Sequence, residues 1–162
     1  MLDGTIIRAH QHSSGASGAS GGQEKQHLGR SCGGFSTKIH AKVDALGLPL
    51  KYILTSGESH EITVAKDLIA DDNCEYLLAD RGYDADYFRD DLSILGISPV
   101  IPSRKNRILP RQYDKEIYKN RNQVERFFNR LKNFRRIATR YDKTAIMYMA
   151  TLVIAGILLW LK

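Results

Sequence analysis

The sequence predicts an α/β fold in which a mixed β-sheet is flanked by helices. Three observations support this class: strand patterns gather in the first sixty residues, helical and strand patterns then alternate, and two helical stretches close the chain. A chain of 162 residues, 43% of them hydrophobic, is long enough for one domain with a buried core. We therefore expect a single domain over residues 1–162.

The first part of the chain has the patterns of antiparallel strands. Residues 1–9, MLDGTIIRA, form a β-rich run, and residues 13–22, SSGASGASGG, cannot pack a core and predict a flexible loop. Residues 33–44 alternate apolar and polar side chains with a period of two, which is typical of a half-buried strand. A short connection, ALGLP, leads to the next strand at 50–57, and these two strands predict a hairpin.

Helices and short strands alternate in the middle of the chain. Residues 59–72 predict a helix, which includes the segment SHEITVA; its histidine, His60, is expected to be structural. The run YLLA then leads to Asp80, followed by a second helix at 84–95 and a short strand at 98–103. We expect the strand that ends at Asp80 to lie inside the sheet. Ligands of open α/β sheets gather at the carboxyl ends of strands, so Asp80 is a candidate for chemistry.

An apolar stretch closes the chain. Residues 145–161 are uncharged and lie between Lys143 and Lys162. This stretch is short for a membrane span of about 20 residues, and a helix buried against a sheet is also hydrophobic on all sides. We therefore expect a core helix rather than a membrane anchor. The start of the chain lacks a secretory pattern, and Cys32 and Cys74 have no metal-binding spacing, so we expect a cytoplasmic protein without a membrane partner.

The positive charge is concentrated in one segment. The formal net charge is +6, but residues 104–140 contain thirteen Lys and Arg against three acids, a local charge of +10. Aromatic side chains are interleaved with these basic residues. This pattern favours a polyanionic partner such as DNA, and a solvated basic face without a ligand is the alternative.

Residues 118–136, YKNRNQVERFFNRLKNFRR, predict one helix with a single acid. At about 100° per residue, Tyr118, Arg121, Glu125 and Lys132 share one stripe at the edge of the apolar face. An i,i+4 ion pair with Arg121 is a sufficient structural role for Glu125. The boundary position favours the other interpretation, in which Glu125 belongs to a site that binds phosphates.

Three carboxylates on separate predicted elements, Asp3, Asp80 and Glu125, form the candidate site. Each has a structural alternative: a turn before Gly4, a turn in DRGYD, and the helical ion pair. Together, without a His or Cys cluster, they suit hard cations such as Mg²⁺. Two such ions about 3.5 to 4 Å apart activate an attacking oxygen and stabilise a leaving one at a phosphodiester. Arg121 then suits the neighbouring phosphate, which its guanidinium can bind with two hydrogen bonds.

The spacing of Tyr118, Arg121, Glu125 and Lys132 resembles the Y-(2)-R-(3)-E-(6)-K signature of DDE transposases from bacterial insertion sequences, most closely the insertion-sequence-five family. The resemblance covers nearly the whole chain. LDGTIIRAHQH is similar to the first catalytic block of that family, GGFSTKIHAKVDALGLPL to its central strands, LLADRGYDAD to its second block, and VERFFNRLKNFRRIATRYDKTA to its third. It implies a ribonuclease-H-like fold.

The resemblance also implies a site and a reaction. Asp3, Asp80 and Glu125 would be the catalytic, metal-binding triad, holding two Mg²⁺ ions for which Mn²⁺ can substitute. Water would cleave DNA at the insertion-sequence ends, and the freed 3′-hydroxyl would attack target DNA without a covalent enzyme intermediate. The expected partners are terminal-repeat and target DNA and, because two ends must meet, a second copy in a homodimer. The expected DNA-binding residues are Tyr118, Arg121, Arg126, Arg130, Lys132, Arg135 and Arg136.

Family members carry an N-terminal, helical DNA-binding region ahead of the first aspartate. Since that aspartate is Asp3 here, we expect this region to be absent, through a second reading frame or a truncation. Three alternatives to an active catalytic domain stay open at this point. They are a catalytically inactive DNA-binding remnant or regulatory fragment, a junction-resolving nuclease of similar fold, and a membrane-anchored basic protein.

Overall fold

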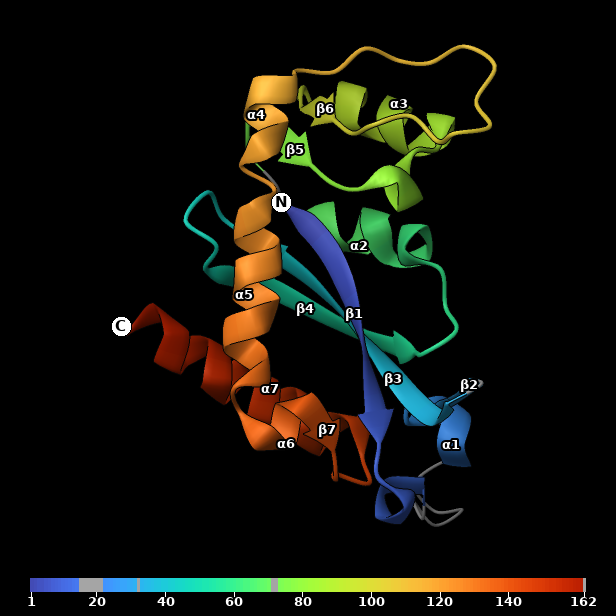
Figure 1. Cartoon of the computed structure of the whole chain (residues 1–162), viewed down its shortest axis with the longest axis vertical. Helices are drawn as coiled ribbons and strands as arrows, with labels where there is room; N and C mark the ends of the chain where they lie inside the picture. The colour runs from blue at the N-terminus through green and yellow to red at the C-terminus, as the bar shows by residue number, and fades with distance from the viewer. Residues whose placement is uncertain (15–21, 32, 71–72, 162) are drawn as a thin grey trace.

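The computed structural model describes residues 1–14, 22–31, 33–70 and 73–161 (Figure 1). Most of the predicted flexible loop at 13–22 lies outside these residues. The described chain has the predicted α/β class, with a mixed sheet and helices packed against it.

The main sheet has five strands, with β3 (Gly34–Val43) at its centre. β1 (Leu2–Ala9) pairs antiparallel with β3, from Leu2 opposite Lys42 to Arg8 opposite Ser36. β3 and β4 (Pro49–Ser56) form the predicted hairpin. β2 (Gly29–Ser31) also pairs with β3, and β7 (Thr139–Arg140) pairs parallel with the end of β1, which makes the sheet mixed.

The strand before Asp80 is not part of that sheet. β5 (Tyr76–Leu78) pairs in parallel with β6 (Ser98–Val100) in a separate two-stranded sheet. The prediction of an interior strand was therefore wrong. β5 has only three residues and its ladder is made with β6, so it meets β1 through side chains: Leu2, Leu77 and Ala79 share one buried cluster. Asp80 still follows the carboxyl end of its strand.

The predicted helices are present, but two of them are subdivided. The helix expected at 59–72 consists of a 3₁₀ turn, η3 (Glu61–Val64), followed by α2 (Ala65–Ile69). The next helix is α3 (Asp86–Ile94). Shorter helical segments are η1 (Gln11–Ser14), α1 (Gly22–Lys25) and η4 (Arg81–Tyr83).

The single helix expected at 118–136 is wrong in its continuity. Three segments replace it: α4 (Lys115–Lys119), α5 (Asn122–Lys132) and α6 (Arg135–Ala138). At the first junction the backbone tightens to i→i−3 hydrogen bonds, from Arg121 N–H to the Tyr118 carbonyl at 2.9 Å and from Val124 N–H to the Arg121 carbonyl at 3.1 Å. Arg121 therefore lies at a break in the helix.

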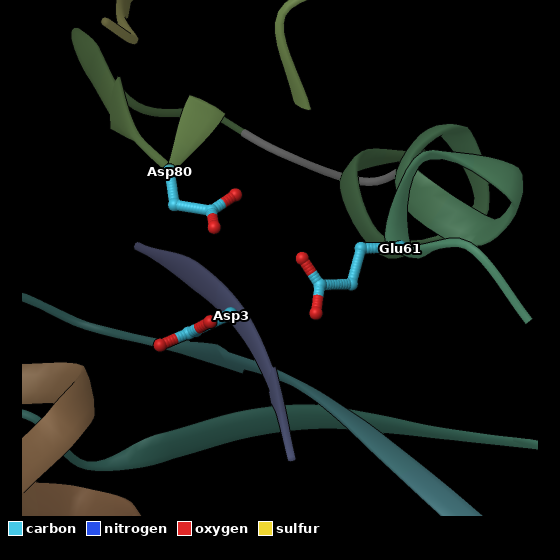
Figure 2. A group of neighbouring side chains, drawn as sticks. All are labelled: Asp3, Glu61 and Asp80. Carbon is cyan, nitrogen blue, oxygen red and sulfur yellow. The ribbon is translucent and has the colours of Figure 1, made fainter. Parts of the chain in front are cut away.

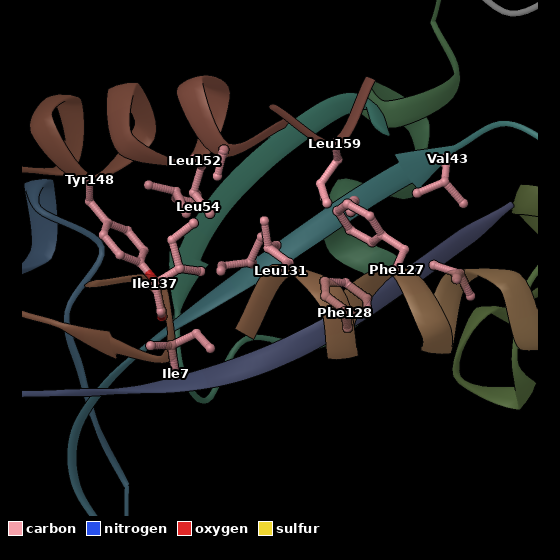
Figure 3. Packing of buried hydrophobic residues seen from close by; sticks show 14 residues of the cluster. Ile7, Val43, Leu54, Phe127, Phe128, Leu131, Ile137, Tyr148, Leu152 and Leu159 are labelled. Carbon is pink, nitrogen blue, oxygen red and sulfur yellow. The ribbon is translucent and has the colours of Figure 1, made fainter. Parts of the chain in front are cut away.

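Two hydrophobic clusters lie on opposite faces of the main sheet, because successive residues of a strand point to opposite sides. Ile7 belongs to the cluster that contains α5 and α7 (Ala145–Trp160), where Leu131 and Leu152 meet the strands (Figure 3). Leu2 belongs to the other cluster, which contains α2, α3 and β5. Asp3 and Asp80 directly follow Leu2 and Ala79 of this second cluster, whereas Glu125 lies on α5.

The final helix is only partly a core helix. One face of α7 packs in the first cluster through Tyr148, Leu152, Ala155 and Leu159. The prediction of a fully buried helix was wrong for the other face, where apolar side chains are exposed, among them Ile146, Ile154, Ile157 and Trp160. None of the described helices has the length and apolar character needed to cross a membrane.

Candidate active site

Asp3 lies at the start of β1 with its side chain only 14% exposed. Its carboxylate accepts a hydrogen bond from the Gly4 N–H at 2.8 Å and pairs with Arg121 Nη2 at 2.9 Å. Burial raises the pKa of the Asp3 carboxyl to about 6; Arg121 opposes this rise, and Asp80 and Glu61 add to it. The fold therefore holds Asp3 where negative charge already accumulates.

This raised pKa gives a testable pH dependence of stability. The folded protein binds the Asp3 proton more tightly than the unfolded chain does. Protonated Asp3 therefore stabilises the folded state below pH 4, and this stabilisation is lost as the pH rises through about 6. Asp3→Asn stays neutral at every pH. In EDTA, its free energy of unfolding relative to the parent is expected to increase between pH 4 and pH 7 by on the order of 2 to 3 kcal/mol. Urea titrations measure this difference, and a pH-independent difference would contradict it.

Asp80 caps the turn that follows β5. Its carboxylate accepts a hydrogen bond from the Gly82 N–H at 2.8 Å, so the turn expected in DRGYD is present. A Cβ atom at Gly82 would lie 2.9 Å from Asp80 Oδ1 and 2.9 Å from Glu61 Oε2. Because Gly82 has no side chain, the carboxylates of Asp80 and Glu61 can both approach its backbone. Asp80 can therefore cap the turn and also face Glu61.

Glu61 is the residue that the sequence analysis missed. It is the first residue of η3, and it brings its carboxylate to Asp3 and Asp80, so that one ligand atom from each lies within 4.8 Å of the others (Figure 2). Figure 2 shows the three side chains arriving from separate elements. Lys38 Nζ contacts Glu61 Oε1 at 3.1 Å. The available signal was an acid at the start of the helix after the hairpin, next to His60.

Glu125 reaches this cluster through Arg121. It lies on α5 with its side chain 59% exposed, and its Oε1 accepts from Arg121 Nη1 at 2.6 Å. Because Arg121 also binds Asp3, one guanidinium bridges Asp3 and Glu125. Burial opposes the charge of Arg121, but Asp3, Asp80 and Glu125 outweigh it and raise its pKa. The structure thus contains the helical ion pair and places it beside the acids.

The other two residues of the signature, Tyr118 and Lys132, lie on α4 and α5. Tyr118 is half-buried, and its ring meets Tyr113 edge to face with centroids 5.3 Å apart. Burial raises the pKa of the Tyr118 hydroxyl, Arg121 opposes the rise and Asp80 adds to it, so Tyr118 lies near the acids. Lys132 is exposed at the end of α5.

Comparison with known proteins decides the family. A family model described as a transposase DDE domain matches residues 1–160. The chain belongs to this family. The match confirms the resemblance to DDE transposases, with which the insertion-sequence-five assignment is compatible, and confirms the ribonuclease-H-like fold class. This family generally uses divalent metal ions, and the cluster of Asp3, Glu61 and Asp80 is a group that could hold one.

Two relatives support the assignment of this transposase domain. It is 37% identical over 130 residues to a putative transposase for insertion sequence element IS6501 of Brucella ovis, covering 79% of this chain and 100% of the relative. It is 31% identical over 128 residues to a putative transposase for insertion sequence element IS402 of Burkholderia cepacia, covering 72% of this chain and 58% of the relative. No solved structure matches the transposase domain.

The other basic residues that were predicted to bind DNA fall into two groups. Arg126, Lys132 and Arg135 are exposed. Arg130 and Arg136 are also at the surface but have structural contacts: Arg130 Nη2 donates to the Gly47 carbonyl at 2.8 Å, and Arg136 Nη2 pairs with Asp142 Oδ1 at 2.7 Å. Within the described part of the chain, Arg126, Lys132 and Arg135 form no such contact, so their side chains are available to a ligand.

The basic linker between β6 and α4, residues 101–114, holds the turn after Asp80 in place. Asp84 is buried and accepts from Arg89 Nε at 2.8 Å, from Arg107 Nη1 at 3.0 Å and from the Arg104 N–H at 2.9 Å. Burial raises the pKa of the Asp84 carboxyl, but these hydrogen bonds outweigh it and the pKa is lowered. Arg104 Nη2 also donates to the Gly82 carbonyl at 2.9 Å, which ties the linker to the turn that carries Asp80.

Removing the carboxylate of Asp84 is expected to destabilise the transposase domain. Asp84→Ala leaves Arg89 buried without its anion, which costs about 3 to 5 kcal/mol in comparable buried pairs. Asp86 is the matched control, because its carboxylate is exposed and pairs with Arg111 at 3.1 Å. Asp86→Ala should lower the free energy of unfolding much less, because solvent screens an exposed ion pair. Equal losses in urea titrations would show that the Asp84 network is not structural.

Proposed function

We propose that this domain cleaves DNA at the ends of an insertion sequence and joins the freed 3′ ends to target DNA, with Mg²⁺ as cofactor. The observation that carries the proposal is the convergence of Asp3 and Asp80 from β1 and β5, with Glu125 linked to Asp3 through Arg121. In a transposase domain, this arrangement supports the assignment of Asp3, Asp80 and Glu125 as the catalytic triad.

The ligand set fits Mg²⁺, with Mn²⁺ as a substitute. Among the described residues, the clustered groups are carboxylates, Glu61 among them, without an imidazole or a thiolate. Two ions bound here would polarise the scissile phosphate, activate the attacking oxygen and stabilise the leaving one. Because the negative charge exceeds what Arg121 and Lys38 neutralise, the site favours added cations.

Arg121 would change partners when DNA binds. In the DNA-free domain its guanidinium neutralises Asp3 and Glu125 at 2.9 and 2.6 Å. Two oxygens of a phosphate can accept the same pair of hydrogen bonds from a planar guanidinium as a carboxylate does. Transfer of Arg121 to a DNA phosphate would free Glu125 to complete the metal site. Lys132 and Tyr118, on the same helical segments, would contact neighbouring phosphates.

The exposed basic residues supply a prediction about DNA affinity. Arg126 and Arg135 would contact phosphates, which position the duplex without reading its sequence. The double variant Arg126→Gln/Arg135→Gln should weaken binding to any duplex and reduce the slope of log K against log salt by about 2. Fluorescence anisotropy at several salt concentrations measures this slope. Lys66→Gln, which removes an exposed lysine outside the basic segment, should leave the slope unchanged. Equal slopes in parent and double variant would contradict the assignment.

DNA joining tests the proposed function against the alternatives. The substrate is a pre-cleaved duplex with an insertion-sequence end and a free 3′-hydroxyl, mixed with supercoiled plasmid and Mg²⁺. A transposase domain joins the two molecules and relaxes the plasmid, and a 3′-deoxy end prevents joining. Cleavage of branched DNA without joining would favour a junction-resolving nuclease. Salt-sensitive binding without either reaction would favour an inactive DNA-binding remnant.

A further inference from the structure

Glu61 is better placed than Glu125 to meet a cation in the DNA-free domain. Its side chain is 19% exposed against 59% for Glu125. Glu61 Oε2 and Asp80 Oδ1 approach Gly82 from the same side, each 2.9 Å from where a Cβ would stand. Glu125 Oε1 is instead 2.6 Å from Arg121 Nη1. Among the described residues, the carboxylate group that could hold a metal ion contains Glu61 and not Glu125.

A buried histidine beside Glu61 indicates independently that something binds there. His40 is fully buried, and its Nε2 lies 2.8 Å from Thr55 Oγ1. Since the Thr55 hydroxyl donates to the Ser56 carbonyl at 3.2 Å, we assign the His40 proton to Nε2, and Nδ1 then carries a lone pair. Within the described part of the chain, Nδ1 has no hydrogen-bond partner.

Nδ1 of His40 and the carboxylate of Glu61 both come close to Gly4 of β1. A Cβ atom at Gly4 would lie 3.2 Å from Glu61 Oε1 and 3.4 Å from His40 Nδ1, so both atoms approach β1 at one point. Burial, with Lys38 adding to it, lowers the pKa of His40 to about 4, which keeps the ring neutral. Glu61 Oε1 has Lys38 Nζ as a partner at 3.1 Å, whereas Nδ1 of His40 has no donor among the described residues. A water molecule held in the acidic cluster would supply it.

A buried tyrosine near the cluster also has a polar group without a partner among the described residues. Tyr83 is fully buried, and among the described residues its hydroxyl has no hydrogen-bond partner. Burial raises the pKa of this hydroxyl well above its usual range, and the charges of Glu61, Asp3 and Asp80 raise it further. The hydroxyl therefore lies within the field of all three carboxylates. His40 and Tyr83 are an acceptor and a donor left open around one acidic cluster.

We propose that Glu61 is a fourth metal-binding carboxylate of this centre. With Asp3 and Asp80 it would ligate the first divalent cation to bind the DNA-free domain, and Glu125 would join only after DNA withdraws Arg121. Lys38 would hold Glu61 through Oε1, leaving Oε2 directed toward Asp80. The inference rests on the proposed function, because it assigns a further ligand to the same metal site.

The simpler alternative is that Glu61 serves only as the ion-pair partner of Lys38. The two roles differ in what Lys38→Gln does. If the pair is purely structural, Lys38→Gln and Glu61→Gln lower stability alike and neither changes metal affinity. If Glu61 is a ligand, only Glu61→Gln weakens metal binding, since Lys38→Gln leaves the carboxylate in place. Thermal unfolding in EDTA separates these effects on stability from those on metal affinity.

The test is direct titration of the DNA-free protein with Mn²⁺, in which electron paramagnetic resonance measures the bound and free ion. Glu61→Gln is expected to weaken the tightest Mn²⁺ site by about ten-fold or more, whereas Glu125→Gln and Lys38→Gln retain nearly the parent affinity. Glu116→Gln is the matched control, because Glu116 is an exposed glutamate paired with Lys119 at 2.7 Å. Glu61→Asp, which keeps the charge on a shorter side chain, should bind with intermediate affinity and replaces Glu61→Gln if that variant does not fold.

The outcomes separate this inference from the proposed function. If Asp3→Asn and Asp80→Asn weaken Mn²⁺ binding but Glu61→Gln or Glu61→Asp keeps parent affinity, Glu61 is not a ligand and the proposed function stands. If Glu125→Gln weakens binding as much as Glu61→Gln does, the order of assembly is wrong and the inference is overturned. If neither aspartate variant changes Mn²⁺ affinity, the metal site of the proposed function is itself wrong.

Discussion

Replacing Asp80 by Asn is expected to lower the rate of DNA cleavage on the order of 10³-fold or more. An amide cannot supply the negative oxygen that the metal ions require, and it presents an N–H group in its place. The fold should survive, because the Asn side-chain oxygen can still accept from the Gly82 N–H, which caps the turn at 2.8 Å in the parent. Single-turnover nicking of an end-labelled duplex measures the effect.

Asp86→Asn is the matched control for Asp80→Asn. Asp86 lies six residues further along, and its exposed carboxylate pairs with Arg107 and Arg111 rather than with the cluster. Its substitution should leave the nicking rate close to that of the parent. A retained rate in Asp80→Asn, or an equal loss in both variants, would remove Asp80 from the reacting site.

Arg121→Gln is expected to lower cleavage about 100-fold. Two effects combine, because the variant loses the cation proposed to hold the scissile phosphate and leaves Asp3 without its partner at 2.9 Å. Glutamine cannot neutralise Asp3, so the pKa of that carboxyl should rise above its present value of about 6. The pH at which nicking reaches half its maximum should rise with it. Nicking rates between pH 5 and pH 9 measure both changes.

Arg121→Lys distinguishes charge from geometry. Lysine keeps the positive charge but cannot bridge two carboxylates, or bind one phosphate, with a planar fork. It should therefore restore the pH profile more completely than the maximal rate. A parent-like rate in Arg121→Gln would show that Arg121 is only the ion-pair partner of Glu125, the simpler role that the helical spacing allows.

The acids on β1 and after β5 were predictable because their positions depend on local features. Asp3 lies in a β-rich run, and Asp80 lies where a short apolar strand meets a turn, so each is at an element end that the sequence marks. That they belong to one site was implied by the resemblance of LDGTIIRAHQH and LLADRGYDAD to the catalytic blocks of DDE transposases. The pairing of β5 with β6, rather than with the main sheet, was not predictable. The sequence of a three-residue strand does not indicate which strands pair with it.

Glu61 was not predictable because its position depends on distant contacts. Its orientation depends on a 3₁₀ turn after the hairpin, on Lys38 in β3 and on the absence of a side chain at Gly82. The helix break at Arg121 has the same character, because Arg121 bonds to Asp3 at the far end of the sequence. α7 shows a related limit: its apolar residues surround the helix, so the pattern could not tell the packed face from the exposed one.

We propose above all that Asp3, Asp80 and Glu125 form a metal-dependent DNA-cleaving site. The most direct measurement is nicking of a linear duplex that carries an insertion-sequence end, by the purified chain, in Mg²⁺ or in EDTA, with Glu125→Gln beside the parent. We expect nicking by the parent in Mg²⁺, none in EDTA, and a loss on the order of 10³-fold in Glu125→Gln. Nicking that persists in EDTA, or that Glu125→Gln performs at the parent rate, would contradict the proposal.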